Sequence, residues 1–64
     1  MPVSYPYNAT TTKDTQLIVL GGDNVNVPAG TLITVHGETG AFGTVSVTLA
    51  GTTHSGAMLR ADYR

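Results

Sequence analysis

"TVSVTL" (Thr44–Leu49) decides the fold class of this chain. Apolar and hydroxyl side chains alternate strictly along it, with one leucine and two valines on the same parity. Such alternation is typical of a β-strand that has one buried face and one polar face. The stretch therefore predicts a half-buried strand. Its other face, formed by Thr44, Ser46 and Thr48, is expected to meet water or a polar partner.

The segments around this strand also predict strands separated by glycine-rich connections. "TQLIVL" is a continuous apolar run, which predicts a central strand covered on both faces. In the last segment, Leu59, Ala61 and Tyr63 share one parity. Phe42 has the parity of the threonine face, so either it covers that face or Gly43 lies in a bulge that changes the register. The other expected strands cover residues 15–20, 24–27, 31–36 and 57–64, and the expected loops cover residues 37–43 and 50–56.

About five short strands at this spacing, with no helical periodicity, predict an all-β domain. The expected architecture is a small antiparallel β-sandwich or an open barrel, because parallel crossovers need helices. With 64 residues and no cysteine, the chain has a small core and no disulfide to support it. The sequence therefore favours oligomerisation or docking on a partner.

Residues 1–12 predict an extended N-terminal arm, and residues 13–64 the β body. Two prolines remove backbone donors from the arm, and residues 8–12 contain no apolar side chain larger than alanine. Tyr5 and Tyr7 flank Pro6, and tyrosine offers a large contact area with a polar tip. These three residues are interpreted as anchors that dock in a partner's groove, and the alternative is that they fold back on their own body.

Composition excludes several classes of partner. Lys and Arg number only three and the net charge is −1, so no basic surface is available to bind nucleic acid. No apolar run approaches the roughly 20 residues of a membrane span, and the first residues do not resemble a secretion signal. Charged residues make up 11% of the chain, compared with about 25% in an average domain. A surface of Thr, Ser, Asn and Gly suits a broad, flat contact with another protein. The protein is expected to act in the cytoplasm, or to be assembled there into something larger.

Neither catalysis nor a cofactor is expected. His54 and Ser55 with Asp62 could suggest a nucleophile and its base, but neighbouring side chains on a strand point apart. Four polar residues could in principle bind a metal ion, but their spacing matches no known ligand motif. The residues considered for that site are Asp23, His36, Glu38 and His54.

"NVPAGTLIT" (Asn26–Thr34) resembles the Pro-Ala-Gly-Thr turn and strand of β-clip domains, a group that includes antifreeze-like domains and lambda-type phage head decoration proteins. The whole plan of an extended arm and a compact, cysteine-free β body is similar to small phage capsid decoration or cement proteins. The resemblance implies a β-clip-like fold, and a structural virion protein that stabilises the assembled capsid.

The partner implied by this resemblance is the major capsid protein or another virion protein, with assembly in the host cytoplasm. A homo-oligomer is expected, with a trimer favoured. Two alternatives stay open: a tail, head-completion or fibre component, and a small soluble β binding module. The residues expected to bind the partner are Tyr5, Pro6, Tyr7, Thr44, Ser46 and Thr48.

Overall fold

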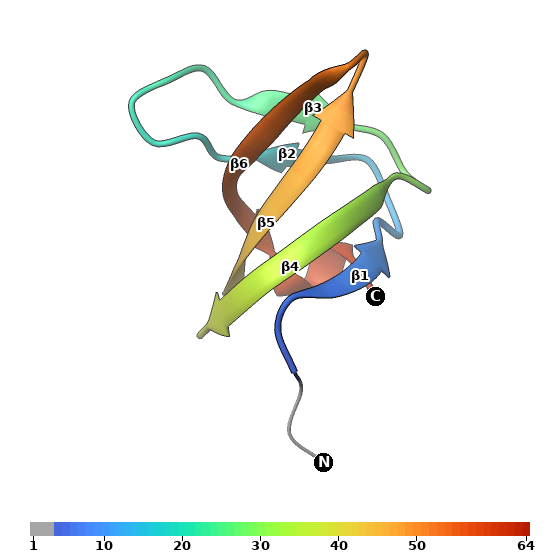
Figure 1. Ribbon diagram of the computed structural model, residues 1–64, viewed down its shortest axis with the longest axis vertical. Helices are drawn as coiled ribbons and strands as arrows, with labels where there is room; N and C mark the ends of the chain where they lie inside the picture. The colour runs from blue at the N-terminus through green and yellow to red at the C-terminus, as the bar shows by residue number, and fades with distance from the viewer. Residues whose placement is uncertain (1–3) are drawn as a thin grey trace.

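The computed structural model describes residues 4–64 as an all-β domain (Figure 1), and this confirms the predicted fold class. There are six strands and one short 3-10 helix in the described part of the chain. The strands are β1 (Tyr7–Thr10), β2 (Thr15–Leu17), β3 (Val25–Val27), β4 (Leu32–Thr39), β5 (Phe42–Leu49) and β6 (Thr52–Leu59), and the helix is η1 (Arg60–Asp62).

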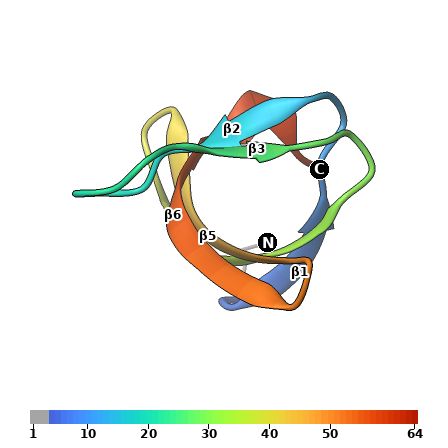
Figure 2. The same ribbon diagram turned by 90° about the horizontal axis from the view of Figure 1, so that it is seen from above.

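All strand pairs are antiparallel and form two sheets. The larger sheet has the order β1-β4-β5-β6, and the smaller one pairs β2 with β3. A bridge between Ile18 and Ala57 connects the end of β2 to β6. Figure 2 shows the two sheets curved around a common centre, with the β2–β3 connection extending away from the body. The chain thus forms a small, partly open barrel.

The core fills this centre and is made of inward-facing side chains from all six strands. Val45 and Val47 of β5 are buried and alternate with exposed or half-buried hydroxyl residues, as the sequence predicted. Phe42 lies on the hydroxyl face and is 43% exposed, which selects the first of the two alternatives for this residue. The buried apolar residues are Ala9, Leu17, Val27, Ile33, Val35, Val45, Val47, Met58 and Tyr63.

The prediction of a central strand over residues 15–20 is wrong. Strand β2 ends at Leu17 and lies in the two-stranded sheet. Leu17 is buried, whereas Ile18 is 46% exposed and Leu20 is fully exposed. Because β2 packs only its inner side against the core, the apolar run is divided between the core and a protruding loop.

The two predicted loops around β5 are also wrong, because both are tight hairpin turns between long strands. Strand β4 continues through Thr39, and β6 begins at Thr52. Gly40 and Gly51 have positive φ values of 62° and 81°, a conformation that glycine adopts without steric cost. Each turn needs only two residues, so the sheet extends much further than the glycine content suggests.

A β-bulge in β4 changes which face its last residues occupy. Val35 pairs with Val45, but the next pair is Gly37 with Thr44, so His36 is the extra residue. After the bulge, Glu38 pairs with Gly43 and shares the inner face with Val45. The bulge therefore directs the Glu38 carboxylate toward the inside of the barrel.

The expectation of an extended arm over residues 1–12 is wrong from Tyr7 onward, and residues 1–3 lie outside the described part of the chain. Strand β1 pairs with β4 from Tyr7↔Val35 to Thr10↔Leu32. Ala9 is buried, and Thr11 is only 2% exposed. The Thr11 hydroxyl donates to the Pro28 carbonyl oxygen (2.7 Å) and accepts from the Thr31 amide (2.9 Å). The burial of Ala9 and the hydrogen bonds of Thr11 thus join this segment to the body.

The C-terminal segment does not form the predicted strand over residues 57–64. Met58 is buried and Leu59 is 44% exposed, which is the reverse of the predicted parity. Helix η1 then interrupts the alternation and returns Tyr63 to the core, where its backbone bridges Thr11. Among residues 4–64, no helix has the length and apolar character needed to span a membrane.

Replacing Val47 by Asp should prevent folding. The side chain is 2% exposed, and an unpaired charge at such a position costs about 3–5 kcal/mol. A domain of this length has roughly 3–10 kcal/mol of stability in total. The control is Thr44→Asp on the exposed face of the same strand, which should cost less than about 1 kcal/mol. Circular dichroism and urea unfolding measure both, and equal losses would contradict the assigned faces of β5.

Deleting residues 1–12 should leave a chain that does not fold, because it removes β1, Ala9 and Thr11 together and exposes the edge of β4. Tyr5→Ala is the matched variant within the same segment. Its side chain is 43% exposed and makes one hydrogen bond, so this variant should stay folded. The measurement is circular dichroism with size-exclusion chromatography. A soluble, cooperatively folded truncated chain would restore the interpretation of residues 1–12 as a separate arm.

Candidate functional site

The outward side of the four-stranded sheet is the most distinctive surface of the molecule. Cross-strand register places the hydroxyl residues of β5 next to residues of the same kind: Ser46 lies between Thr34 and Ser55. We call this surface the outer face. It consists of Asn8, Thr10, Leu32, Thr34, His36, Gly37, Thr39, Phe42, Thr44, Ser46, Thr48, Thr53, Ser55, Ala57 and Leu59.

No Asp, Glu, Lys or Arg among the described residues belongs to the outer face. The three basic and four acidic residues of the chain all lie in loops, near the chain ends or on the inner side. They are Lys13, Asp14, Asp23, Glu38, Arg60, Asp62 and Arg64. Depletion of charge is the compositional feature that distinguishes the centre of a protein–protein interface from ordinary surface.

Hydrogen bonds between side chains organise the outer face. The imidazole Nε2 of His36 lies 2.8 Å from Ser46 Oγ, which lies 3.1 Å from Ser55 Oγ. Thr48 and Thr53 form a parallel pair with 3.0 Å between their hydroxyl oxygens. These hydrogen bonds restrict the side chains that form them, which lowers the entropy that fixing them in a contact would cost.

The outer face has a shallow depression and an apolar border. The depression measures about 440 Å³ and is lined by Leu32, Thr34, His36, Ser46, Thr48 and Thr53. Leu32 is 65% exposed at one end, and the cross-strand pair of Phe42 and Leu59 is 43% and 44% exposed at the other. Large apolar groups around an uncharged polar centre offer both contact area and hydrogen-bonding groups to a partner.

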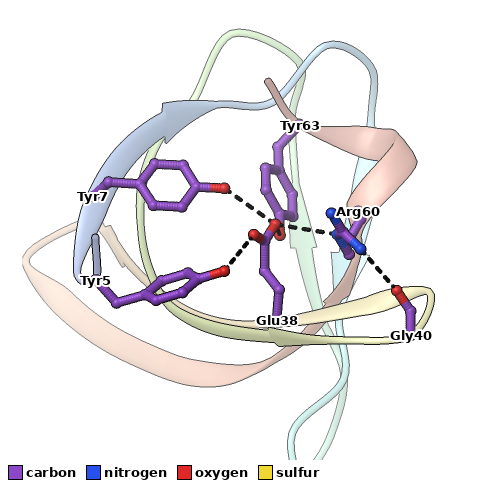
Figure 3. A network of polar contacts seen from close by, with 6 residues as sticks. All are labelled: Tyr5, Tyr7, Glu38, Gly40, Arg60 and Tyr63. Atoms are coloured by element: carbon purple, nitrogen blue, oxygen red, sulfur yellow. Dashed lines mark hydrogen bonds and ion pairs between the residues drawn. The ribbon is translucent and has the colours of Figure 1, made fainter. Parts of the chain in front are cut away.

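A second polar cluster lies on the inner side, around the Glu38 carboxylate (Figure 3). Tyr5 donates to Oε1 (2.8 Å), whereas Tyr63 and Tyr7 donate to Oε2 (2.6 and 3.1 Å). Arg60 Nε lies 3.3 Å from Oε2, and its guanidinium also donates to the Gly40 carbonyl oxygen (3.0 Å). All three tyrosines of the chain therefore converge on one carboxylate, whose side chain is 9% exposed.

The electrostatics of this cluster favour an ionised Glu38. Hydrogen bonds from Tyr63 and then Tyr5 lower the pKa of Glu38 from 4.5 to about 2, against the opposing effect of burial. Burial, followed by the hydrogen bond to Glu38, raises the pKa of Tyr7 and of Tyr63. The hydrogen bond to Glu38 is the main cause of the raised pKa of Tyr5. The carboxylate and the neutral phenols thus stabilise one another across a wide pH range.

The residues expected to bind a partner fall into two groups that the structure does not bring together. Thr44, Ser46 and Thr48 lie on the outer face, as predicted. Tyr5 and Tyr7 instead bond to their own body through Glu38, which is the alternative considered for them from sequence. Pro6 is exposed between these two tyrosines. A role of these N-terminal residues in binding a partner stays a prediction.

The polar residues considered for catalysis or metal binding are also separated. His54 pairs with Val47 and Ser55 with Ser46, so their side chains belong to opposite faces. Asp62 instead accepts a hydrogen bond from Thr15 (2.6 Å) and pairs with Lys13 (3.2 Å). Within residues 4–64, no three His, Cys, Asp or Glu side chains are placed to hold a metal ion.

Sequence reasoning missed two parts of the outer face. Thr53 and Ser55 lie within the predicted loop over residues 50–56, although the alternation of "TTHSG" continues that of β5 across a two-residue turn. His36 ends the predicted strand over residues 31–36, and its contact with Ser46 depends on a register that the sequence does not specify.

No protein family, no curated protein and no solved structure matches this chain.

Replacing Glu38 by Gln should remove a large part of the acid sensitivity of folding. The folded-state pKa of about 2 lies below the ordinary 4.5, so ionised Glu38 contributes its full stabilisation above about pH 4.5 and loses it as the pH falls toward about 2. The free energy of unfolding of the wild type should therefore fall across this window, and that of Glu38→Gln should fall less steeply.

Urea unfolding at several pH values measures this difference. The pKa of Asp62 is also lowered, chiefly by its hydrogen bond from Thr15, so Asp62→Asn serves as the comparison and should remove only its own share of the slope. Identical slopes for wild type and Glu38→Gln would show that the tyrosine cluster does not act through the ionised carboxylate.

Proposed function

We propose that this protein is a structural protein that docks on the surface of a larger protein assembly through its outer face. The assembly that the sequence resemblance points to is a phage capsid, on which this chain would act as a decoration or cement protein. The observation that supports the proposal most strongly is the absence of charge from the outer face. A partner surface that is itself uncharged can cover such a face without leaving any charge unpaired.

The composition of the outer face also indicates which chemical groups a partner surface would present to it. Each serine and threonine hydroxyl both donates and accepts a hydrogen bond. The face can therefore bind backbone amides, carbonyl groups or hydroxyls of a protein surface without requiring a charged ligand. Leu32, Phe42 and Leu59 would pack against apolar side chains around this centre. These properties favour the shell of a protein lattice over a nucleic acid or a small charged ligand.

Binding of this kind stabilises an assembly by mass action. A subunit that binds the assembled shell, and not its separated components, makes disassembly more costly by its binding free energy. Subunits that bridge two neighbouring shell proteins add an avidity term. From Tyr7 onward, the N-terminal segment also completes the domain that presents the outer face.

Replacing Thr48 by Asp should leave the fold intact and weaken attachment to the shell at least about tenfold, because its partner on this face is the neutral Thr53 and an unpaired charge buried in a contact costs more than the roughly 1.4 kcal/mol of a tenfold change. The measurement is a binding titration on viral shells assembled without this protein. Circular dichroism of the free subunit is read beside it.

Asn26→Asp is the matched control. Asn26 Oδ1 accepts a hydrogen bond from Gln16 on the exposed side of the two-stranded sheet, and the carboxylate keeps this acceptor while adding the same charge. This variant should bind the shell like wild type. Equal binding by Thr48→Asp and wild type, or equal weakening in both variants, would exclude the outer face as the docking surface.

A further inference from the structure

His36 is the one titratable side chain on the outer face among the described residues. It is exposed at the bulge of β4 and contacts Ser46 of β5. His54, the other histidine, belongs to the inner parity of β6, where it pairs with Val47. Because imidazole changes charge near neutral pH, a single protonation can place a charge on a surface that otherwise has none.

The groups around His36 do not supply a counter-charge on this face. On β4 itself, Glu38 lies on the inner side because of the bulge, where it is paired with Arg60 and three tyrosines. On β1, Tyr7 lies on the inner face with Val35. On β5, the neighbours of His36 are the neutral residues Thr44 and Ser46. A proton on His36 would therefore face the partner without compensation from its own subunit.

Protonation also fixes the direction of the first link in the hydrogen-bond chain from His36 through Ser46 to Ser55. A neutral imidazole Nε2 can accept the Ser46 proton or donate its own. A protonated imidazole can only donate, so Ser46 Oγ accepts from His36, and this polarisation favours donation of the Ser46 proton to Ser55 Oγ. In that arrangement the Ser55 proton is directed away from Ser46 and is available to the partner.

We infer that docking through the outer face is acid-sensitive, with His36 as the switch and Ser46 as the residue that passes its state to Ser55. This inference rests on the proposed function, since it describes the regulation of the same surface. Neutral His36 leaves a face that an uncharged partner can cover. Protonated His36 adds an unpaired positive charge and favours an arrangement in which the Ser55 proton is available to the partner.

The first test uses the free protein and no partner. NMR titration from about pH 8 to about pH 5 follows the His36 imidazole nitrogens and the Ser55 Cβ resonance. In the wild type, Ser55 should change with the same midpoint as His36. In Ser46→Ala, His36 should still titrate and the Ser55 response should disappear. An unchanged Ser55 in the wild type, or an equal response in Ser46→Ala, would overturn the role of the hydroxyl chain.

The second test repeats the titration onto shells lacking this protein at about pH 7.5 and about pH 5.5, on either side of the ordinary histidine range. Wild type should bind about tenfold or more weakly at the lower pH, because the added charge is unpaired in the contact. His36→Gln keeps a hydrogen-bonding group beside Ser46 but cannot titrate, so its affinity should not change with pH. His54→Gln is the control and should behave like wild type.

The outcomes separate the two proposals. Binding that is strong and independent of pH in the wild type overturns the acid switch and leaves the docking function in place. An equal pH response in wild type and His36→Gln overturns the assignment of the switch to His36. Absence of binding at both pH values overturns the docking function itself, and with it any regulation of that surface.

Discussion

One extra residue in β4 decides what each face of the sheet contains. Strict alternation after Val35 would place Glu38 on the outer face beside Phe42. The bulge at His36 shifts the register, so Glu38 pairs with Gly43 and points inward. The same bulge therefore keeps a negative charge off the outer face and supplies the carboxylate that the tyrosines need. Both polar clusters of the molecule depend on this single irregularity.

The polar cluster around Glu38 adds to the stability of a chain that is too short to form a large hydrophobic core. Glu38 of β4 binds Tyr5 and Tyr7 near the N-terminus and Tyr63 near the C-terminus, so it connects the two ends of the domain through the middle of the sheet. Gly43 makes room for this contact, because a Cβ atom there would collide with the Tyr63 hydroxyl. In a chain without cysteine, hydrogen bonds to one buried carboxylate take the place of a covalent connection.

Sequence reasoning succeeded where one pattern determined the structure by itself. The alternation of Thr44–Leu49 predicted the fold class, the buried valines and the three hydroxyl residues that β5 contributes to the outer face. It failed where long-range pairing decided the outcome. The apolar character of residues 15–20 does not reveal that β2 has only one covered side, and the glycines of residues 37–43 do not reveal that the strands continue through them. A small residue such as Ala9 gives no hydrophobic signal of its burial, which depends on the β1–β4 pairing.

Under the proposed docking function, the small area of the outer face favours attachment in many copies. Strands lie about 4.8 Å apart and rise about 3.3 Å per residue, so a sheet of four strands and eight residues offers on the order of 500 Å² to a flat partner. A stable pairwise interface usually buries about 800 Å² on each side. The outer face alone would therefore bind weakly, and repeated contacts on a lattice would supply the remaining stability through avidity. Under the same proposal, an uncharged face of this area suits a subunit that distinguishes an assembled surface from its separate parts.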